Sequence, residues 1–285
     1  MKTHTLETQS STTPATALEF LREGNQRFVT NLKAHRDLLQ QANDTREGQW
    51  PFAVIVSCID SRTSSELIFD QGLGDIFSIR IAGNVINTDI MGSLEFACRV
   101  AGSKLIVVLG HSKCGAIKGA CDHLEMGNLT ELLSKIQPAV YAETVTTAGD
   151  QRNSKNSAFV ENVSSLNVKH SVKTILNRSP ILEHMLQEGE VGIIGAKHDL
   201  ESGLVEFLED TWVCNTKSSK DRRPRFTEAE IVGFLREADA GTPVTDLCRK
   251  HGFSDASYYH WRSKFGGMRL PDAKRVQALD VGVPN

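Results

Sequence analysis

The sequence predicts an α/β fold, in which a mainly parallel β-sheet is flanked by helices and a small all-α domain follows at the carboxyl end. Short apolar runs rich in β-branched residues, such as 52–56 and 105–109, are typical of strands buried on both faces of a parallel sheet. These runs alternate with helical patterns, as they do in α/β proteins. Residues 226–285 instead carry helical patterns alone, and the charge balance changes from −7 over 1–216 to +4 over 217–285, so we expect a separate domain there.

The expected elements of the first domain alternate in type along the chain. The polar start, 1–14, is interpreted as a flexible tail, and apolar residues at helical spacing predict an amphipathic helix over 15–31. Strands are expected at 52–57, 76–80, 105–109, 191–198 and 204–208, of which the last two form a hairpin at one edge of the sheet. Further helices are expected at 63–70, 89–101, from 114 onward, at 159–176 and at 179–187. The polar stretch 142–156 is expected to be exposed.

Composition limits the class of protein. With 285 residues, of which 40% are hydrophobic and 24% charged, the chain can bury a full core. It has no run of about eighteen apolar residues, and its start lacks the apolar centre of a signal peptide, so we expect a cytoplasmic protein with no membrane partner. Six unevenly spaced cysteines favour thiols and metal ligands over a disulfide framework. A basic stretch at 215–225 predicts a linker between domains at 15–214 and 226–285.

Two short strings that follow apolar runs contain the strongest functional signal. Cys58 and Asp60 come after the first run, and His111 and Cys114 come after the later one. Clefts of α/β sheets form at the carboxyl ends of parallel strands, so these side chains are expected to converge. Two thiolates and one imidazole are a familiar zinc ligand set with one position left over. We therefore expect Cys58, His111 and Cys114 to bind Zn²⁺.

The roles of the remaining candidate side chains stay open. Asp60 could be the fourth zinc ligand and close the site. Alternatively, it could form a bidentate ion pair with Arg62 and leave the metal open to water. Five further histidines have no partner at ligand spacing and are interpreted as surface or locally bonded side chains: His35, His123, His170, His184 and His198.

The carboxyl-terminal segment has the pattern of a helix-turn-helix unit. Thr227 and Glu230 have capping-box spacing and open a first helix, 244–251 is a second, and 256–265 is a third. Trp261 and Phe265, four residues apart, are expected to face a small core. Other residues of the third helix could approach a DNA major groove and phosphates: Ser257, Tyr258, Tyr259, His260, Arg262 and Lys264. A three-helix bundle that does not bind DNA is the alternative.

Residues 15–209 resemble the β-class carbonic anhydrases. The resemblance rests on four motifs, LREGNQRF at 21–28, CIDSR at 58–62, RIAGN at 80–84 and GHSKCGA at 110–116. It implies a zinc enzyme that interconverts carbon dioxide and bicarbonate, built on a mainly parallel sheet and assembled as a homodimer or homotetramer. It also implies that the amino-terminal helix reaches a second subunit, which would explain the apolar face formed by Leu18, Leu21 and Phe28.

The resemblance further implies roles for particular residues. Zinc would lower the pKa of bound water from about 15.7 toward about 7 and so supply hydroxide at neutral pH. Asp60, held by Arg62, would accept a hydrogen bond from that hydroxide and orient it toward carbon dioxide. Gln49 is similar to the substrate-binding glutamine of one subgroup, and a solvated loop amide is the alternative for it.

Residues 222–275 resemble the amino-terminal helix-turn-helix subunit of insertion-sequence transposases, on the segments 225–231, 247–253 and 259–268. The long leucine-zipper helix of that family is not continued here, because Gly282 and Pro284 cannot sustain a coiled coil. We interpret the segment as a fused mobile-element fragment with at most weak DNA binding. The alternative for the whole chain is a DNA-binding protein that uses the anhydrase-like fold for oligomerisation.

Overall fold

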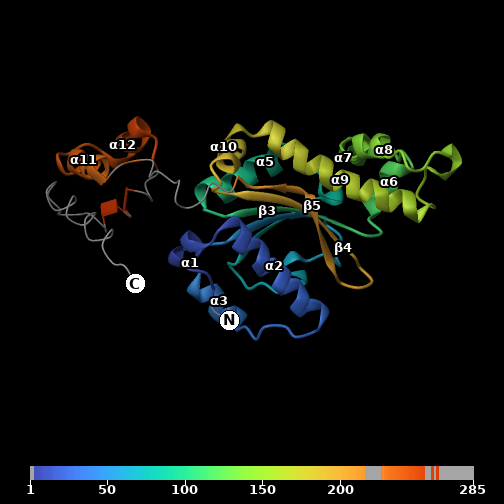
Figure 1. The fold of residues 1–285 in the computed structure, drawn as a ribbon, viewed down its shortest axis with the longest axis horizontal. Helices are drawn as coiled ribbons and strands as arrows, with labels where there is room; N and C mark the ends of the chain where they lie inside the picture. The colour runs from blue at the N-terminus through green and yellow to red at the C-terminus, as the bar shows by residue number, and fades with distance from the viewer. Residues whose placement is uncertain (1–2, 216–225, 227, 254–257, 260, 263–285) are drawn as a thin grey trace, which may run out of the picture. The chain divides into compact units, whose positions relative to one another are not determined.

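The computed structural model describes residues 3–215, 226, 228–253, 258–259 and 261–262. The chain forms two compact units, Met1–Lys217 and Ser218–Asn285, which are described one at a time. The first unit contains a five-stranded sheet with helices on both faces (Figure 1). The predicted α/β class with a mainly parallel sheet is therefore confirmed. Among the described residues, no helix is both long enough and apolar enough to span a membrane.

The sheet has the strand order β2-β1-β3-β4-β5. Its strands are β1 (Ala53–Ser57), β2 (Ile76–Arg80), β3 (Leu105–His111), β4 (Gly192–His198) and β5 (Val205–Val213). The first four are parallel, and β5 runs antiparallel to β4 as the predicted hairpin requires. Two strands are longer than predicted. Strand β5 continues to Val213, and β3 continues to His111. One candidate ligand is therefore itself a strand residue.

Successive residues of the central strands point to opposite faces of the sheet, and each face has its own apolar core. Val54 and Val56 of β1 face one core, and Ala53 and Ile55 face the other. The first core is closed by α5 (Thr88–Glu95), the π-helical turn η2 (Phe96–Val100), α9 (Ser157–Arg178) and α10 (Pro180–Gln187). The second is closed by α2 (Pro14–Val29), on the other side of the sheet (Figure 1).

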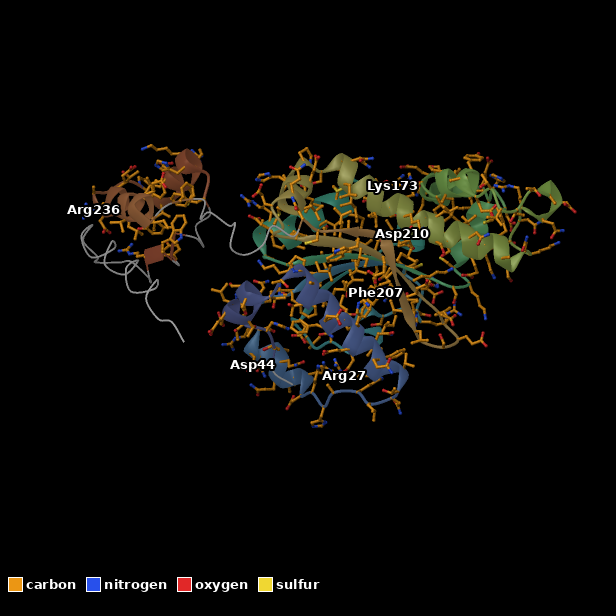
Figure 2. The ribbon with its side chains drawn as sticks, in the orientation of Figure 1. Arg27, Asp44, Lys173, Phe207, Asp210 and Arg236 are labelled. Carbon is orange, nitrogen blue, oxygen red and sulfur yellow. The ribbon has the colours of Figure 1, made fainter. Side chains whose placement is uncertain are left out.

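The edge strand β5 also presents different side chains to the two layers (Figure 2). Phe207 packs into the core on the α2 side, where the guanidinium of Arg22 lies 5.1 Å from the centre of its ring. Asp210 lies on the α9 side and pairs with Lys169 of that helix at 2.5 Å. Both layers are therefore fastened to the edge of the sheet as well as to its centre.

A third apolar cluster lies where the chain leaves β1 and β3. The helices α6 (Gly115–Cys121), α7 (Gly127–Ser134) and α8 (Gln137–Ala142) contribute Ile117, Leu133 and Val140, which pack with Phe159 of α9. The candidate ligands Cys58 and Cys114 belong to the same cluster, so an apolar wall backs them. Short elements complete the unit: α1 (Leu6–Ser11), α3 (Leu38–Asp44), α4 (Ser65–Ile68), η1 (Ala82–Asn84) and η3 (Gly149–Gln151).

The amino-terminal segment differs from the flexible tail expected over 1–14. Residues 6–11 form α1, which is capped by Thr5, and Gln9 within it is buried. The Gln9 amide donates from Nε2 to the carbonyl oxygens of Pro51 and Ala101, at 2.8 and 2.9 Å. These bonds fasten α1 to the loops before β1 and β3. The polar composition of the segment concealed the contact, because its partners are backbone carbonyls distant in the sequence.

Buried contacts bear on two further expectations, of which the contact of α2 with a second subunit stays a prediction. Leu18 and Leu21 of α2 are buried against the chain's own sheet. Their apolar character therefore needs no second subunit to explain it. The stretch 142–156 is mostly exposed, as expected, but Glu143 within it is buried and pairs with Arg152 at 2.8 Å. A polar run can therefore form a buried ion pair that its composition does not reveal.

The second unit contains α11 (Glu228–Asp239) and α12 (Val244–His251), where two helices were predicted. Within the predicted third helix, residues 258, 259, 261 and 262 are helical. Trp261 is partly buried against the core of this unit, as expected. Tyr258 was expected to approach DNA but is fully buried in that core, because it lies three residues before Trp261 and shares its helix face. Four residues named in the same prediction lie outside the described residues: Ser257, His260, Lys264 and Phe265.

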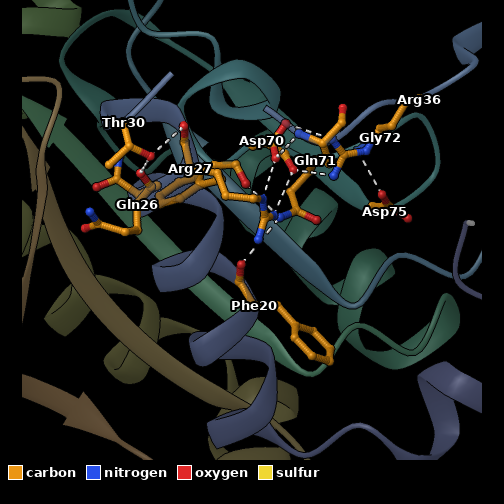
Figure 3. Close-up of polar contacts among 12 residues, drawn as sticks. Phe20, Gln26, Arg27, Thr30, Arg36, Asp70, Gln71, Gly72 and Asp75 are labelled. Atoms are coloured by element: carbon orange, nitrogen blue, oxygen red, sulfur yellow. Dashed lines mark hydrogen bonds and ion pairs between the residues drawn. The ribbon is translucent and has the colours of Figure 1, made fainter. Parts of the chain in front are cut away.

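Asp70 joins the end of α2, the segment after it and the end of α4 (Figure 3). Its carboxylate accepts hydrogen bonds from Arg27 Nε at 2.6 Å, Arg36 Nη1 at 2.7 Å and the Ala34 N–H at 3.1 Å. The side chains of Asp70 and Arg36 are only 5% and 6% exposed. Burial opposes ionisation of Asp70, but the hydrogen bonds from Arg27, Ala34 and Arg36 outweigh it and lower its pKa.

We expect Asp70→Asn to lower the free energy of unfolding of the first unit by about 3 kcal/mol at pH 7, because it leaves two guanidinium groups without their carboxylate. Asparagine tolerates the left-handed backbone at this position, where φ is +42°, so the change tests the charge. Urea unfolding curves of the full chain measure the effect.

The same comparison has a defined pH dependence. The pKa of Asp70 is lowered on folding, so its contribution is complete above the ordinary aspartate pKa of about 3.9 and disappears as the pH falls through the folded-state value. Glu47→Gln, which removes a pair with Arg46 whose side chains are 75% and 85% exposed, is the control and should change stability by less than about 0.5 kcal/mol. Equal effects of the two substitutions would contradict the assignment.

Candidate metal centre

The candidate ligands lie at one edge of the sheet because of how β1 and β3 pair. The two strands are parallel neighbours, with Ser57 opposite Leu109. Cys58 therefore follows the end of β1 at the level where β3 ends in His111. Cys114 comes three residues later as the N-cap residue of α6. Parallel register thus brings together two strings that are more than fifty residues apart in the chain.

The three donor atoms occupy a volume that suits one metal ion. One atom from each of Cys58, His111 and Cys114 lies within 4.8 Å of the other two, and all three residues are buried. The two sulfur atoms are 3.9 Å apart. Sulfurs bound to one tetrahedral zinc at about 2.3 Å would be separated by roughly 3.8 Å. The observed spacing therefore fits a shared ion without rearrangement.

The imidazole of His111 is oriented toward the same volume. Its Nδ1 lies 2.9 Å from the carbonyl oxygen of Ser112, which selects the tautomer that is protonated at Nδ1. Nε2 is then an acceptor, and it is buried without a hydrogen-bond partner among the described residues. A buried imidazole nitrogen with no partner destabilises the fold unless something binds it. A metal ion held with the two sulfurs would satisfy it.

The two thiols share their ionisation. A hydrogen bond from Cys114 lowers the pKa of Cys58 to about 4, and the same interaction raises the pKa of Cys114. The pair therefore holds one thiolate readily and resists forming the second. A divalent cation would supply the charge needed to ionise both sulfurs.

Asp60 pairs with Arg62 and is outside the donor group. Its Oδ1 accepts from Arg62 Nε at 2.9 Å and from the Arg62 backbone N–H at 3.0 Å, and its Oδ2 accepts from Nη2 at 2.8 Å. These hydrogen bonds hold the pKa of Asp60 well below its ordinary value. Of the two arrangements that the sequence left open, the structure has the one in which Arg62 holds the carboxylate.

Further contacts around the ligands were not anticipated from the sequence. Arg80 of β2 donates from Nε to the carbonyl oxygen of Cys58 at 3.1 Å and from Nη2 to that of Asp60 at 2.6 Å, which fixes the loop between them. The Ser112 hydroxyl donates to Asp199 Oδ1 at 3.1 Å and so ties the loop after β3 to the turn after β4. The RIAGN motif contained Arg80, but the motif alone gives no role for it. Ser112 and Asp199 carry no spacing signal at all.

The structure places two other residues named in the sequence analysis, Gln49 and His198, outside the group of three donors. Gln49 is exposed and precedes β1, whereas Cys58 follows that strand, so the length of β1, about 16 Å, lies between the positions at which they join it. The structure of one chain does not bring Gln49 to the donors. His198 was expected at the surface or locally bonded, but it is buried, and both its ring nitrogens lack a hydrogen-bond partner among the described residues. Its place at the end of β4, beside His111 of β3, explains its burial.

A buried group of two thiols and one imidazole, at the carboxyl ends of parallel strands of an α/β protein, is a donor set that could hold a metal ion. The family model described as carbonic anhydrase matches residues 53–205, and the chain belongs to that family. It is 35% identical over 202 residues to carbonic anhydrase 2 of Mycobacterium tuberculosis, which covers 68% of this chain and 92% of the relative. It is 31% identical over 235 residues to the carbonic anhydrase of Synechococcus elongatus, covering 79% and 82% of the two chains.

Solved structures support the same fold. The β-carbonic anhydrase CcaA matches with a TM-score of 0.53 at 24% identity, over 67% of this chain and 86% of that one. One of two tetrameric β-carbonic anhydrases from Sordaria macrospora matches with a TM-score of 0.52 at 28% identity, over 58% and 84%. The fold of the first unit is therefore that of the β-carbonic anhydrases.

The carboxyl-terminal segment has separate relatives. A family model described as transposase matches residues 220–282. The segment is 63% identical over 59 residues to an uncharacterized 10.0 kDa protein of insertion element IS407 from Burkholderia multivorans, which covers 21% of this chain and 68% of the relative. Both resemblances identified in the sequence are thus confirmed, and they meet near residue 217, where the two compact units divide.

We expect the purified chain to retain about one zinc per polypeptide, and Cys114→Ala to lose at least about 90% of it, because two remaining donors hold zinc far less tightly than three. Cys98→Ala is the matched control. Cys98 is also a buried cysteine but belongs to η2 and faces the first core, where burial raises its pKa to about 12. Elemental analysis after gel filtration measures zinc content, and equal zinc in the two variants would show that Cys114 is not a ligand.

Proposed function

We propose that the chain catalyses the zinc-dependent, reversible hydration of carbon dioxide to bicarbonate and a proton. Membership of the carbonic anhydrase family supports the reaction. The observation that most directly supports zinc is the convergence of Cys58, His111 and Cys114, with a buried imidazole nitrogen that has no partner among the described residues. We infer that these three residues are the protein ligands at rest.

Zinc bound to these ligands would act as a Lewis acid and acidify a water molecule toward neutral pH. Asp60 would accept a hydrogen bond from the attacking water and so orient it toward carbon dioxide. Arg62 supports this role in two ways. Its hydrogen bonds keep Asp60 ionised, so the carboxylate remains an acceptor, and they hold both carboxylate oxygens away from the ligand set. Substrate binding by Gln49 stays a prediction.

We also propose a cytoplasmic homodimer or homotetramer. The two β-carbonic anhydrases from Sordaria macrospora are described as tetrameric, and the structure of one of them matches 58% of this chain. The edge strand β2 pairs only with β1 within the described residues, so its other side is available for contact between copies.

We expect Arg62→Ala to lower carbon dioxide hydration at least about 100-fold while zinc content stays near one per chain. Without the guanidinium, Asp60 is free to bind the metal and occupy the position that water needs. Stopped-flow hydration assays measure the rate, and elemental analysis measures the zinc. Arg46→Ala, which removes another arginine paired with a neighbouring carboxylate, should leave hydration unchanged. Normal turnover by the Arg62 variant would refute the role given to the pair.

DNA binding by the second unit is a second candidate function. Its support is the apolar core that the described residues form around α11 and α12, together with the match to transposase sequences. A segment that forms such a core can fold, so a helix-turn-helix could be presented to DNA. Our leading interpretation remains a fused fragment with at most weak binding, because one residue expected to contact DNA, Tyr258, is buried.

We expect a gel shift at low salt to show only weak retardation that is the same for the insertion element's terminal repeat and for unrelated DNA of equal length. Basic residues near the end of α12, Arg249 and Lys250, account for such sequence-independent attraction to phosphates. Retardation should disappear as salt is raised. Selective retardation of the terminal repeat would overturn the fragment interpretation and favour a DNA-binding protein.

A further inference from the structure

The sulfur of Cys58 accepts a hydrogen bond from a backbone turn that the proposed mechanism does not use. The N–H of Gly83, in η1, donates to Cys58 Sγ at 3.4 Å. Gly83 and Asn84 both have left-handed backbone, with φ of +69° and +44°. A Cβ on Gly83 would also lie 2.7 Å from Ile136 Cδ1. The turn therefore needs glycine here, and two consecutive left-handed residues need support from their surroundings.

That support comes from two polar side chains of α9. Asn167 donates from Nδ2 to the carbonyl oxygen of Gly83 at 2.8 Å. Ser171, one helical turn later, donates from Oγ to the carbonyl oxygen of Asn84 at 3.2 Å. Both side chains are buried, Asn167 completely. The helix that covers the sheet is thus hydrogen-bonded directly to the turn that contacts the metal-ligand sulfur.

Asn167 is a polar side chain buried among apolar residues of the core. Its neighbours on α9, Val163 and Val168, are buried apolar residues of the surrounding clusters. The Oδ1 atom of Asn167 has no hydrogen-bond partner among the described residues. A buried amide that leaves its oxygen unbonded is less favourable than an apolar side chain of similar size. The bond from Nδ2 to Gly83 is the only contribution of this amide that the described hydrogen bonds reveal.

We propose that Asn167 is a positioning residue for the metal centre, which holds the Gly83 carbonyl so that the neighbouring Gly83 N–H stays directed at the Cys58 sulfur. An N–H donor withdraws negative charge from a thiolate. The sulfur then donates less charge to a bound metal, which keeps the metal a stronger Lewis acid. The same bond restricts the rotation of the Cys58 side chain, which favours binding. The inference rests on the proposed metal site.

The test measures metal binding and the spectrum of the bound metal, so it does not depend on turnover. Asn167→Ala removes the donor together with the rest of the amide. Asn167→Leu removes the donor and gives the core an apolar residue of similar size. Ser103→Ala is the matched control, because it also removes a buried side-chain hydrogen bond to a backbone carbonyl, that of Pro51, but in front of β1 and β3 and not at the turn beside Cys58. Circular dichroism and gel filtration of the full chain establish whether each variant folds.

Two readouts are compared in the folded proteins. Chelator competition gives zinc affinity, and the thiolate-to-cobalt charge-transfer absorption of the cobalt-substituted protein reports the charge on the sulfurs. We expect both Asn167 variants to bind zinc about 10- to 100-fold more weakly and to shift the charge-transfer band to longer wavelength. Ser103→Ala should remain within about twofold of the parent in affinity, with an unshifted band.

Several results would overturn the proposal. It fails if either folded Asn167 variant retains the parent affinity and band. It also fails if Ser103→Ala changes both readouts as much as the Asn167 variants do, since the loss of any buried hydrogen bond would then explain the effect. If neither Asn167 variant folds, Asn167 serves the fold itself and the proposal is wrong. A chain that binds cobalt through Cys58 but has no hydration activity would reject the proposed function and leave this inference standing.

Discussion

Parallel pairing of β1 with β3 is the constraint on which the rest of the structure depends. With Ser57 opposite Leu109, both strands deliver their next residues to the same edge of the sheet, and Cys58, His111 and Cys114 meet there. A register change would carry Cys58 about 3 Å along the strand for each residue of slip and disperse the donors. Both strands are buried throughout, so a slip would also misplace two apolar cores, and the fold itself fixes the ligand geometry.

The helical layers complete what the strands begin. The apolar cluster formed by α6, α7, α8 and α9 lies behind the sulfur atoms of Cys58 and Cys114. Because the dielectric constant is low there, electrostatic interactions of these sulfurs are stronger than they would be in water. Arg62 and Arg80 lie on the more open side, and they orient Asp60 and the backbone around it. In this arrangement Asp60 stays outside the ligand set. The second unit shares no residue of this group and has a core of its own.

Much of the fold and the convergence of the three candidate ligands could be predicted because their signals are local. β-Branched runs indicated the strands, and the Cys58 and His111 strings followed directly after two of them. The missed features depend on contacts distant in the sequence. Gln9 fastens α1 through carbonyls of Pro51 and Ala101, and Asn167 reaches Gly83 from 84 residues away. Tyr258 was expected to approach DNA because of its hydroxyl group, although its spacing from Trp261 places it on the buried face of the helix. A hydrogen bond from a side chain to a backbone carbonyl far away in the sequence leaves no periodic pattern. The composition of these segments therefore indicated only that they are polar.

A crystal structure of the zinc-loaded protein at neutral pH, with anomalous data at the zinc edge, tests the central claim most directly. The account predicts one peak per chain, about 2.3 Å from the sulfurs of Cys58 and Cys114 and about 2.0 Å from Nε2 of His111. It also predicts that the Asp60 carboxylate remains on Arg62 and that the fourth ligand is a non-protein oxygen. A peak elsewhere, or Asp60 as the fourth ligand in crystals of the active protein, would contradict it.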